Sequence, residues 1–323
     1  MRWTKIGLIY SPEGSMPWMY SHCQLPVADH LEGDIYRVYF AGRTKEQRSH
    51  IGFVDLDINN PKKILNVAQD PVLIPGPMGF FDEHGVYPSC ILNYNDKKYM
   101  YYIGWNQGVR QPLFYANIGL AISEDSGKTY QKYSSAPIMS RSGYDPCLVT
   151  SPNVFIEDGL WRMTYVSGIK WEENNGKLKS YYHIKYAESK DGINWEREGI
   201  VAIDFQSEKE SNIARSCVIK ENGIYKMWYS FVIPPLKYRI GYAESENGKN
   251  FIRKDHLAGI EPTENGFDSE MLCYPNVVIH KGIKYMFYNG NDFGKNGFGL
   301  AVGCKFLYCS TIAGVKYSTV LLK

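Results

Sequence analysis

Residues 266–299 read GFDSEMLCYPNVVIHKGIKYMFYNGNDFGKNGFG. The segment holds two short runs of β-branched and aromatic residues, 276–279 and 284–288, separated by a Lys-Gly turn. Two such runs joined by a short polar turn are typical of a β-hairpin. An acidic loop precedes the first run, and a glycine-rich loop leads into a third apolar run that begins at residue 298. The segment therefore predicts three consecutive antiparallel strands.

The same pattern occurs four more times along the chain. The first strands of the copies begin near Pro26, Pro88, Pro152, Ser216 and Pro275. A third strand follows in every copy, and a short apolar fourth segment follows in the first four. A four-stranded unit of this size cannot bury a core alone, and stacked repeats of it are typical of a β-propeller. We therefore predict an all-β, five-bladed β-propeller with four antiparallel strands per blade.

The last copy has no fourth strand of its own. The N-terminal run TKIGLIYSP, residues 4–12, resembles the strand that ends the other copies. We expect this run to complete the last blade and close the ring, since closure pairs strand edges that would otherwise be open. Residues 1–323 would then form a single propeller domain, with residues 305–323 as a surplus C-terminal tail.

Composition and charge exclude several classes of function. A net charge of +2 gives no reason to expect binding to nucleic acid or to an anionic membrane. No apolar run is long enough for a membrane-spanning helix, and the N-terminal residues lack the pattern of a secretory signal. Seven scattered cysteines, an odd number, favour reduced thiols. We therefore expect a soluble, cytoplasmic protein without membrane insertion, and no oligomeric state follows from the sequence.

The repeats, together with turns such as SKDGINW at residues 189–195, resemble the five-bladed propeller glycosidases of glycoside hydrolase families 43, 32 and 130. The resemblance covers most of the chain, residues 4–304. Segments such as FDEHGVYP, IARSCV and YMFYNGNDFGKNGFG look like a bacterial subgroup often found among surface-polysaccharide genes. The resemblance implies a carbohydrate-active enzyme of the glycoside hydrolase type, which acts at a glycosidic bond in a pocket on the propeller axis.

Acidic residues precede four of the five first strands. In a propeller the first strand of each blade lines the axis, so the loop before it (here called the lead-in loop) delivers side chains to one end of the axial pocket. Glycoside cleavage requires two carboxyl groups, one protonated and one ionised. From these loops we predict three catalytic residues, which are Glu270, Asp82 and Glu210. The remaining acids of the lead-in loops are predicted to bind the substrate, and these are Glu83, Asp145 and Asp268.

Three carboxylate positions of the family hold other residue types. The resemblance implies one aspartate at the position of Leu25 and another at the position of Ser151. The acidic glutamate that the family places near the fourth first strand is replaced by Ala214 and Arg215. Three alternatives follow: the acids moved into the lead-in loops, the reaction differs, or catalysis was lost. If the acids moved, the function is hydrolysis. If the reaction differs, it is glycosyl transfer or phosphorolysis with a phosphate or nucleotide-sugar, and if catalysis was lost, it is non-catalytic binding of a glycan. A protein-interaction platform is a further alternative.

Other side chains at the same end of the axis are predicted to bind a carbohydrate or sugar-phosphate. Histidine and amide groups suit hydroxyls, arginine suits a carboxylate or phosphate, and aromatic rings stack on sugar rings. The predicted residues are His22, Gln24, Arg43, His84, Tyr87, Trp105, Arg215, Tyr274, Asn289 and Asp292. The structural alternatives are inter-blade salt bridges for the arginines, core packing for the aromatic residues and a tight loop for residues 288–294.

The spacing of histidines and cysteines matches no metal site. The glycine-rich loop does not form a phosphate-binding site, because no helix follows it. No dinucleotide-binding glycine motif occurs after a predicted strand. We therefore predict no metal and no cofactor.

Overall fold

A computed structural model describes residues 1–304 of the chain. The predicted surplus tail, residues 305–323, lies outside the described residues. Within residues 1–304 nearly all regular structure is β-strand, and the exceptions are a 3-10 turn, η1 (Asp255–Leu257), and one helical turn, α1 (Asn291–Gly294). No helix in this part is long and apolar enough to cross a membrane. The predicted all-β class is confirmed for the residues that the structure describes.

The described strands form groups of four, which we call units 1 to 5. Unit 1 contains β2 (Ser21–Glu32), β3 (Ile35–Arg43), β4 (Ser49–Asp57) and β5 (Ile64–Val67). Unit 2 contains β6 (Gly85–Tyr94), β7 (Lys97–Gln107), β8 (Phe114–Ser123) and β9 (Gln131–Lys132). Unit 3 contains β10 (Leu148–Glu157), β11 (Leu160–Asn174), β12 (Lys177–Ser189) and β13 (Val201–Ile203). Unit 4 contains β14 (Asn212–Glu221), β15 (Ile224–Val232), β16 (Arg239–Ser245) and β17 (Ile252–Arg253). Unit 5 contains β18 (Cys273–His280), β19 (Ile283–Asn289), β20 (Phe298–Cys304) and the N-terminal β1 (Arg2–Tyr10).

Neighbouring strands within a unit run antiparallel. A single parallel pair, Ser49 with Gly85, joins units 1 and 2 into one sheet. The pair Tyr182 with Asn212 joins units 3 and 4 in the same way. Unit 5 forms a four-stranded sheet of its own, in the order β1-β20-β19-β18. The N-terminal strand is therefore hydrogen-bonded to the last strand of the described chain.

The turns between the first and second strands follow from two-residue sequences that accept positive φ. Asp158-Gly159 has φ of 50° and 76°, and Asn222-Gly223 has 54° and 80°. Lys281-Gly282, within residues 266–299, has 47° and 77°. Two positive φ values in a row define a type I′ turn, whose twist matches that of the flanking strands. The predicted hairpins thus form where the sequence placed them.

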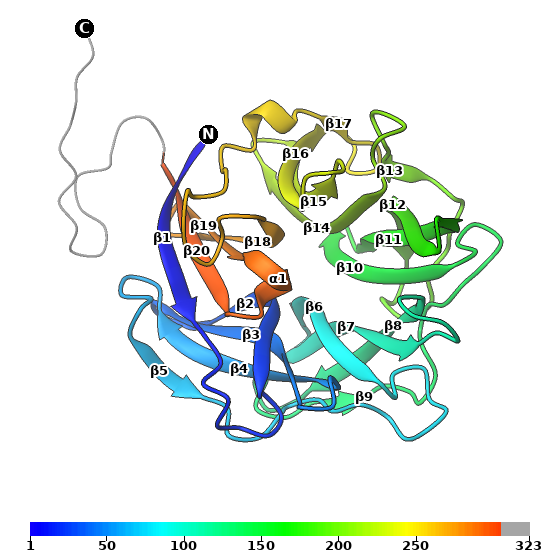
Figure 1. The fold of residues 1–323 in the computed structure, drawn as a ribbon. Coiled ribbons are helices and arrows are strands. Elements are labelled where there is room, and N and C mark those ends of the chain that lie inside the picture. The colour runs from blue at the N-terminus through cyan, green and yellow to red at the C-terminus, as the bar shows by residue number, and fades with distance from the viewer. Residues whose placement is uncertain (305–323) are drawn as a thin grey trace, which may run out of the picture.

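The units are arranged around a common axis, with β2, β6, β10, β14 and β18 innermost (Figure 1). Each innermost strand packs against the next, and β18 packs against β2. Hydrogen bonds from backbone to side chain tie these strands together. Asn153 Oδ1 accepts a bond of 2.9 Å from the Val218 N–H, and Asn276 Oδ1 accepts one of 2.9 Å from the Ala28 N–H.

Cysteines occupy the same position in units 2 and 4. Cys90 Sγ accepts a hydrogen bond of 3.3 Å from the Val154 N–H, and Cys217 Sγ accepts one of 3.1 Å from the Val277 N–H. Both thiols are buried, and burial raises the pKa of each. They therefore replace asparagine in holding neighbouring inner strands together.

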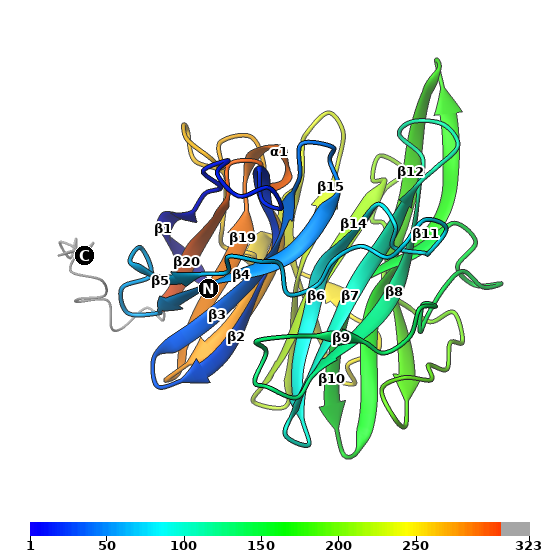
Figure 2. The same ribbon diagram turned by 90° about the horizontal axis from the view of Figure 1, so that it is seen from below.

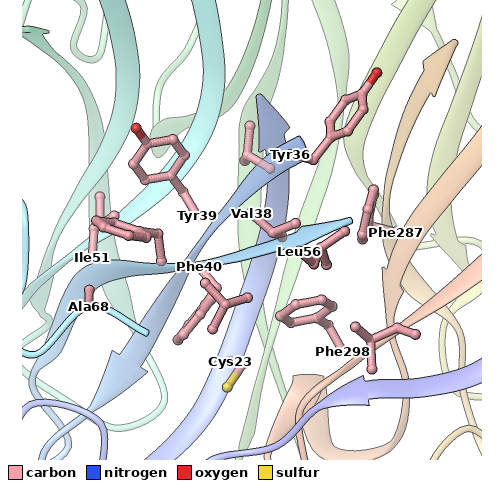
Figure 3. Close-up of a cluster of buried hydrophobic side chains, with 14 of the residues drawn as sticks. Cys23, Tyr36, Val38, Tyr39, Phe40, Ile51, Leu56, Ala68, Phe287 and Phe298 are labelled. Carbon is pink, nitrogen blue, oxygen red and sulfur yellow. The ribbon is translucent and has the colours of Figure 1, made fainter. Parts of the chain in front are cut away.

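Aromatic side chains fill the space where unit 1 packs against unit 5 (Figure 3). The rings of Phe40 and Phe298 lie 5.9 Å apart, and those of Phe287 and Phe298 lie 6.2 Å apart. On the other side of unit 5, Trp3 of β1 packs edge-on against Trp228 of β15 at 5.8 Å. The N-terminal strand thus contributes to the contact between units 4 and 5.

The fourth strands are short, and only β13 lies within one of the apolar segments that the sequence places after the third strands. β9 and β17 contain two residues each; the apolar segments 70–76 and 135–141 supply one isolated bridge each, and the last such segment, residues 257–263 (LAGIEPT), forms no strand. Gly259 instead accepts a hydrogen bond of 3.0 Å from the Trp3 N–H through its carbonyl oxygen. Glycine and proline weaken a strand because they lose packing or a backbone donor, so this stretch runs beside β1 without joining a ladder.

Candidate functional site

The loops that precede the first strands meet the loops between second and third strands at one end of the axis, here called the top face. The register pairs Gly85 with Trp105, Leu148 with Gly168, and Cys273 with Asn289 at this end. α1 lies on this side, and the β11–β12 hairpin extends farther than the neighbouring loops (Figure 2). The top face is therefore bordered by loops from several units.

A β-bulge interrupts every first strand just after its start. Four of these bulges contain a non-glycine residue with positive φ: Leu25 (52°), Ser151 (49°), Arg215 (49°) and Tyr274 (58°). Such a conformation costs about 1–3 kcal/mol, persists only where neighbours hold it, and is common at functional sites. Leu25 and Ser151 are also the positions at which the family resemblance implies carboxylates.

Asn289 holds one of these bulges in place. Its Oδ1 accepts a hydrogen bond of 2.8 Å from the Leu25 N–H, and its Nδ2 donates to the carbonyls of Cys23 at 2.8 Å and Gly297 at 3.0 Å. The side chain is fully buried. The predicted substrate-binding residue Asn289 is therefore fully engaged with the backbone around the start of β2.

Arg43, at the end of β3, connects units 1 and 2 on the top face. Its Nε donates to Gln24 Oε1 at 2.9 Å, and its Nη2 donates to the Tyr87 hydroxyl at 3.1 Å. The Tyr87 and Trp105 rings are stacked with centroids 6.4 Å apart. Four predicted site residues, Gln24, Arg43, Tyr87 and Trp105, are thus brought together.

A second aromatic group comes from units 4 and 5. The Tyr274 ring stacks on Phe293 of α1 at 6.3 Å and lies 6.2 Å from Tyr238. The Tyr238 hydroxyl hydrogen-bonds to that of Tyr182. Burial raises the pKa of the Tyr274 hydroxyl; the charges of Cys273, Tyr182 and Tyr87 raise it further, and Arg43 opposes them. Tyr87, Trp105, Tyr182 and Tyr274 all pack against the hydrophobic cluster that contains Tyr238, and we call these aromatic groups together the top-face site.

Arg215 lies beneath this site, with only 1% of its surface exposed. Its Nη1 donates to the Pro88 carbonyl at 3.2 Å, and its Nη2 donates to the Pro26 carbonyl at 3.4 Å. Burial lowers the pKa of the guanidinium to about 10, so it remains charged at neutral pH. One side chain of unit 4 therefore fixes backbone segments of units 1 and 2, next to Gln24 and Tyr87.

His22 lies at the edge of the same site. Its Nδ1 is 2.8 Å from the Ser21 hydroxyl, and its backbone N–H donates to the Lys295 carbonyl at 3.3 Å. Burial, followed by the charges of Arg43 and Lys295, lowers the pKa of His22 to about 4. The imidazole is therefore neutral at pH 7.

A cavity of about 840 Å³ adjoins the site beside Trp105. Arg48, His50, His84 and Gln107 line it together with residues 74–78. The His84 ring lies 5.7 Å from Trp105, and His84 Nδ1 lies 3.2 Å from a Glu83 carboxylate oxygen that also lines the cavity. His84 and Glu83 thus belong to this side cavity.

The aspartates of the lead-in loops share one buried arrangement. Each accepts a hydrogen bond from a tyrosine of the second strand and pairs with a cation on or near the fourth strand. The sets are Asp82 with Tyr102 (3.2 Å) and Lys132 (2.6 Å), Asp145 with Tyr165 (3.1 Å) and Arg197 (2.9 Å), and Asp268 with Tyr288 (2.9 Å) and Lys5 (2.6 Å). A repeated internal ion pair explains why acids recur before the first strands.

Glu210 takes the corresponding place in unit 4. Its two carboxylate oxygens accept from the Arg253 guanidinium at 2.7 and 2.8 Å, and one also accepts from the Gln206 N–H at 2.8 Å. The side chain is buried. This bidentate pair occupies both oxygens, so Glu210 stabilises the fold of unit 4.

Glu270 and Asp292 are exposed carboxylates of unit 5. Glu270 pairs with Lys237, and its N–H donates to Asn291 Oδ1 at 2.8 Å. Asp292, within α1, has a φ of 51°, and its charge also acts on Lys237. Both therefore border the aromatic group around Tyr274 and Phe293.

Tyr182, Tyr238 and Phe293 belong to the site but are not among the residues predicted from the sequence. Tyr182 lies within β12 (Lys177–Ser189), Tyr238 directly precedes β16, and Phe293 lies in α1 before β20. A search of the segments that connect second and third strands, including the extended β11–β12 hairpin, would have found them. Among residues 1–304 no group of three or more histidine, cysteine, aspartate or glutamate side chains is arranged to hold a metal ion.

The chain is similar to a curated protein over almost its whole length. An uncharacterized protein of Mycobacterium tuberculosis (strain CDC 1551 / Oshkosh), MT1551, is 39% identical over 302 residues, which cover 94% of this chain and 99% of the relative. The sequence profile of the glycosyl hydrolases family 32 N-terminal domain matches residues 62–210.

Solved structures share the fold at low sequence identity. A glycoside hydrolase superposes with a TM-score of 0.74 at 16% identity, covering 97% of this chain and 95% of that chain. A thermostable family-43 glycoside hydrolase superposes with a TM-score of 0.67 at 18% identity, covering 97% and 98%. At these identities the likeness concerns the fold.

Proposed function

Because this chain belongs to the superfamily of propeller-fold glycoside hydrolases, and to one family with the Mycobacterium tuberculosis protein, we propose that it is a carbohydrate-active enzyme acting at a glycosidic bond. Its ligand is a carbohydrate or sugar-phosphate, and its site is the top-face site. We place this activity in the cytoplasm and in surface-polysaccharide metabolism. The thiols of Cys23, Cys90, Cys147, Cys217 and Cys273 and the resemblance to the bacterial subgroup support that placement.

We also propose that units 1 to 5 are the five blades of a single propeller domain. Two observations support a closed ring: β18 packs against β2 through the bond from the Ala28 N–H to Asn276, and β1 pairs with β20. Pairing of the first and last strands is a common way to remove open sheet edges.

The observation that carries the enzymatic proposal is the convergence of two aromatic groups with polar groups between them. Tyr87 and Trp105 form one stack, and Tyr274 and Phe293 form the other. Aromatic faces cover the apolar C–H faces of a sugar ring, while a few fixed polar groups bind its hydroxyls. Arg43 supplies such donors and is itself held by hydrogen bonds to neighbouring side chains.

Glu270 is the proposed catalytic carboxylate. Its side chain is 57% exposed, and its partner Lys237 is 49% exposed, so a substrate can displace the pair at little cost. The sequence also predicts Asp82 and Glu210 as catalytic carboxyl groups. For either to act together with Glu270, Lys132 or Arg253 would have to leave a buried carboxylate, and leaving that charge unpaired has a large free-energy cost.

We therefore assign the second carboxyl group to Asp292. Glu270 and Asp292 both act electrostatically on Lys237. One carboxyl group protonates the leaving oxygen, and the other acts as base or nucleophile.

Binding of a glycan without cleavage is the second candidate function. The side chains at the strained bulge positions favour it, because Leu25, Ser151, Arg215 and Tyr274 include no carboxylate. This candidate predicts saturable glycan binding with no product.

The test combines an oligosaccharide screen with two matched variants. Glu270→Gln removes the proposed acid, and Glu264→Gln removes a carboxylate exposed in the same loop. We expect Glu270→Gln to lower turnover roughly a hundredfold or more while folding is kept, and Glu264→Gln to have no effect. Normal turnover in Glu270→Gln would remove Glu270 from the mechanism, and binding without turnover in the unmodified protein would favour the second candidate.

A further inference from the structure

The arginines of this protein differ in the kind of oxygen that they bind. One group pairs with carboxylates, for example Arg37 with Asp55 at 2.7 Å and Arg253 with Glu210 at 2.7 Å. A second group binds neutral oxygens, and both Arg43 and Arg215 belong to it. Within residues 1–304 no carboxylate oxygen lies within 4 Å of either guanidinium. Neither guanidinium is therefore paired with a carboxylate of the described residues.

The two guanidinium groups act on the same place. Arg43 donates to the Tyr87 hydroxyl at 3.1 Å, and Arg215 donates to the carbonyl of the next residue, Pro88, at 3.2 Å. Both charges also act on the Tyr274 hydroxyl, since Arg43 affects its pKa and Tyr274 affects that of Arg215. A buried or half-buried charge without a counter-charge is costly, so proteins seldom keep one unless a partner supplies the opposite charge.

Arg43 retains donors for such a partner. A guanidinium has five N–H groups. The described residues use one on Nε, one on Nη1 for Gln47 Oε1 at 3.4 Å, and one on Nη2. One N–H therefore remains on each terminal nitrogen, which suits a two-point bond to a carboxylate or phosphate.

Two further cations, Lys295 and Arg48, lie near Arg43, and the glutamates Glu46 and Glu83 line the same cavity as Arg48. The charges of Arg43 and Lys295 both disfavour protonation of His22. Arg48 lines the adjoining cavity and donates to the Glu83 carbonyl, a neutral oxygen. A positive, partly desolvated site attracts anionic ligands and strengthens their hydrogen bonds.

We propose that the sugar bound at the top-face site carries an anionic group, a carboxylate or a phosphate, which Arg43 binds while Arg215 contributes its charge from beneath. This inference rests on the proposed function, because it names the substrate class of the same site. A neutral sugar would leave both guanidinium groups without a counter-charge. A uronic acid within a glycan and a phosphorylated sugar both supply the required chemistry, and the experiment separates them.

The test measures binding to the full chain by titration calorimetry. One arm compares a uronic-acid trisaccharide with its carboxyl-reduced, neutral counterpart, and the other compares a sugar 1-phosphate with the same unphosphorylated sugar. Because hydrogen bonds to a charged group are stronger, we expect one anionic probe to bind roughly tenfold to a hundredfold tighter than its neutral counterpart. The arm in which this preference occurs identifies the anion.

Variants then assign the preference to Arg43. Arg43→Gln should abolish it, whereas Arg2→Gln, which removes an exposed arginine at the far end of β1, should leave it unchanged. Equal binding of anionic and neutral probes to the unmodified protein would overturn the inference but leave the proposed function standing. That comparison needs no substitution, so it decides the matter even if Arg43→Gln fails to fold. Binding of inorganic phosphate with no binding of any sugar would overturn both.

Discussion

Replacing Asp268 by asparagine should destabilise the protein without directly altering the top-face site. Asp268 is 2% exposed and accepts bonds from Lys5 at 2.6 Å, Tyr288 at 2.9 Å and Thr263 at 2.5 Å. Asparagine keeps the shape but loses the charge that balances Lys5. Breaking a buried ion pair costs about 3–5 kcal/mol, and because Lys5 retains some contact with water we expect about 3 kcal/mol.

That loss converts into a measurable shift of the melting temperature. An unfolding entropy of about 2.1 cal/mol/K per residue gives roughly 0.7 kcal/mol/K for the 323 residues of this chain, so about 3 kcal/mol corresponds to a decrease of about 4 °C. Thermal unfolding followed by circular dichroism measures it, with Glu270→Gln as the comparison. The exposed Glu270–Lys237 pair should contribute less than about 1 kcal/mol.

Loss of turnover without loss of stability would refute the structural role of the lead-in aspartates. If Asp268→Asn melts at the temperature of the unmodified protein but loses all turnover, Asp268 acts in catalysis. A loss of stability with turnover retained in the folded fraction supports the ion-pair role. Asp82→Asn and Asp145→Asn should behave in the same way, since each breaks the same kind of buried contact.

Three further predictions concern the ring, the bulge and the pH dependence. Deletion of residues 1–10 should abolish cooperative unfolding, because it removes β1 and the Trp3–Trp228 contact; an unchanged calorimetric transition would contradict the closed ring. Asn289→Ala should weaken sugar binding at least tenfold, measured by calorimetry, because the Leu25 bulge loses its support; full affinity would show that Asn289 does not position the site. Stability should fall as pH decreases from about 6.5 to 4, because the unfolded chain protonates His22 before the folded protein does. His22→Gln should reduce that dependence in urea titrations at pH 7 and pH 4.5, and an unchanged dependence would contradict the buried, neutral histidine.

The sequence predicted the strands well because their signals are local. Alternation of apolar and polar residues and two-residue turns such as Lys281-Gly282 need only neighbouring positions. The match between residues 4–12 and the ends of the other repeats likewise indicated the pairing of β1 with β20. The fourth strands were predicted less well, because pairs such as Ile252 and Arg253 are too short to show a period.

The partners of the lead-in acids could not be found by reading along the chain. Asp82 and Lys132 are 50 residues apart, and Asp268 and Lys5 are 263 apart. The matching contexts FDEHG and FDSEM did indicate a repeated role, and the structure supplies its physical basis. Without these distant partners, a carboxylate held by a cation cannot be distinguished from one such as Glu270 in an exposed loop.

The grouping of several predicted residues at the top face did follow from the sequence. Gln24, Arg43, Tyr87, Trp105 and Tyr274 come from three units, yet the repeat alone placed them at one end of the axis. Their mutual contacts depend on the bulges and on Arg215, whose side chain crosses to other units. Such contacts between repeats follow from the three-dimensional arrangement and not from the period.

The most direct measurement is a crystal structure of the full chain with the oligosaccharide that binds most tightly in the screen. We predict one sugar ring between the Trp105 and Tyr274 side chains, with an anionic group of the ligand hydrogen-bonded to Arg43. A glycan bound only at another surface, with Trp105, Tyr274 and Arg43 in contact with solvent, would contradict the proposed site.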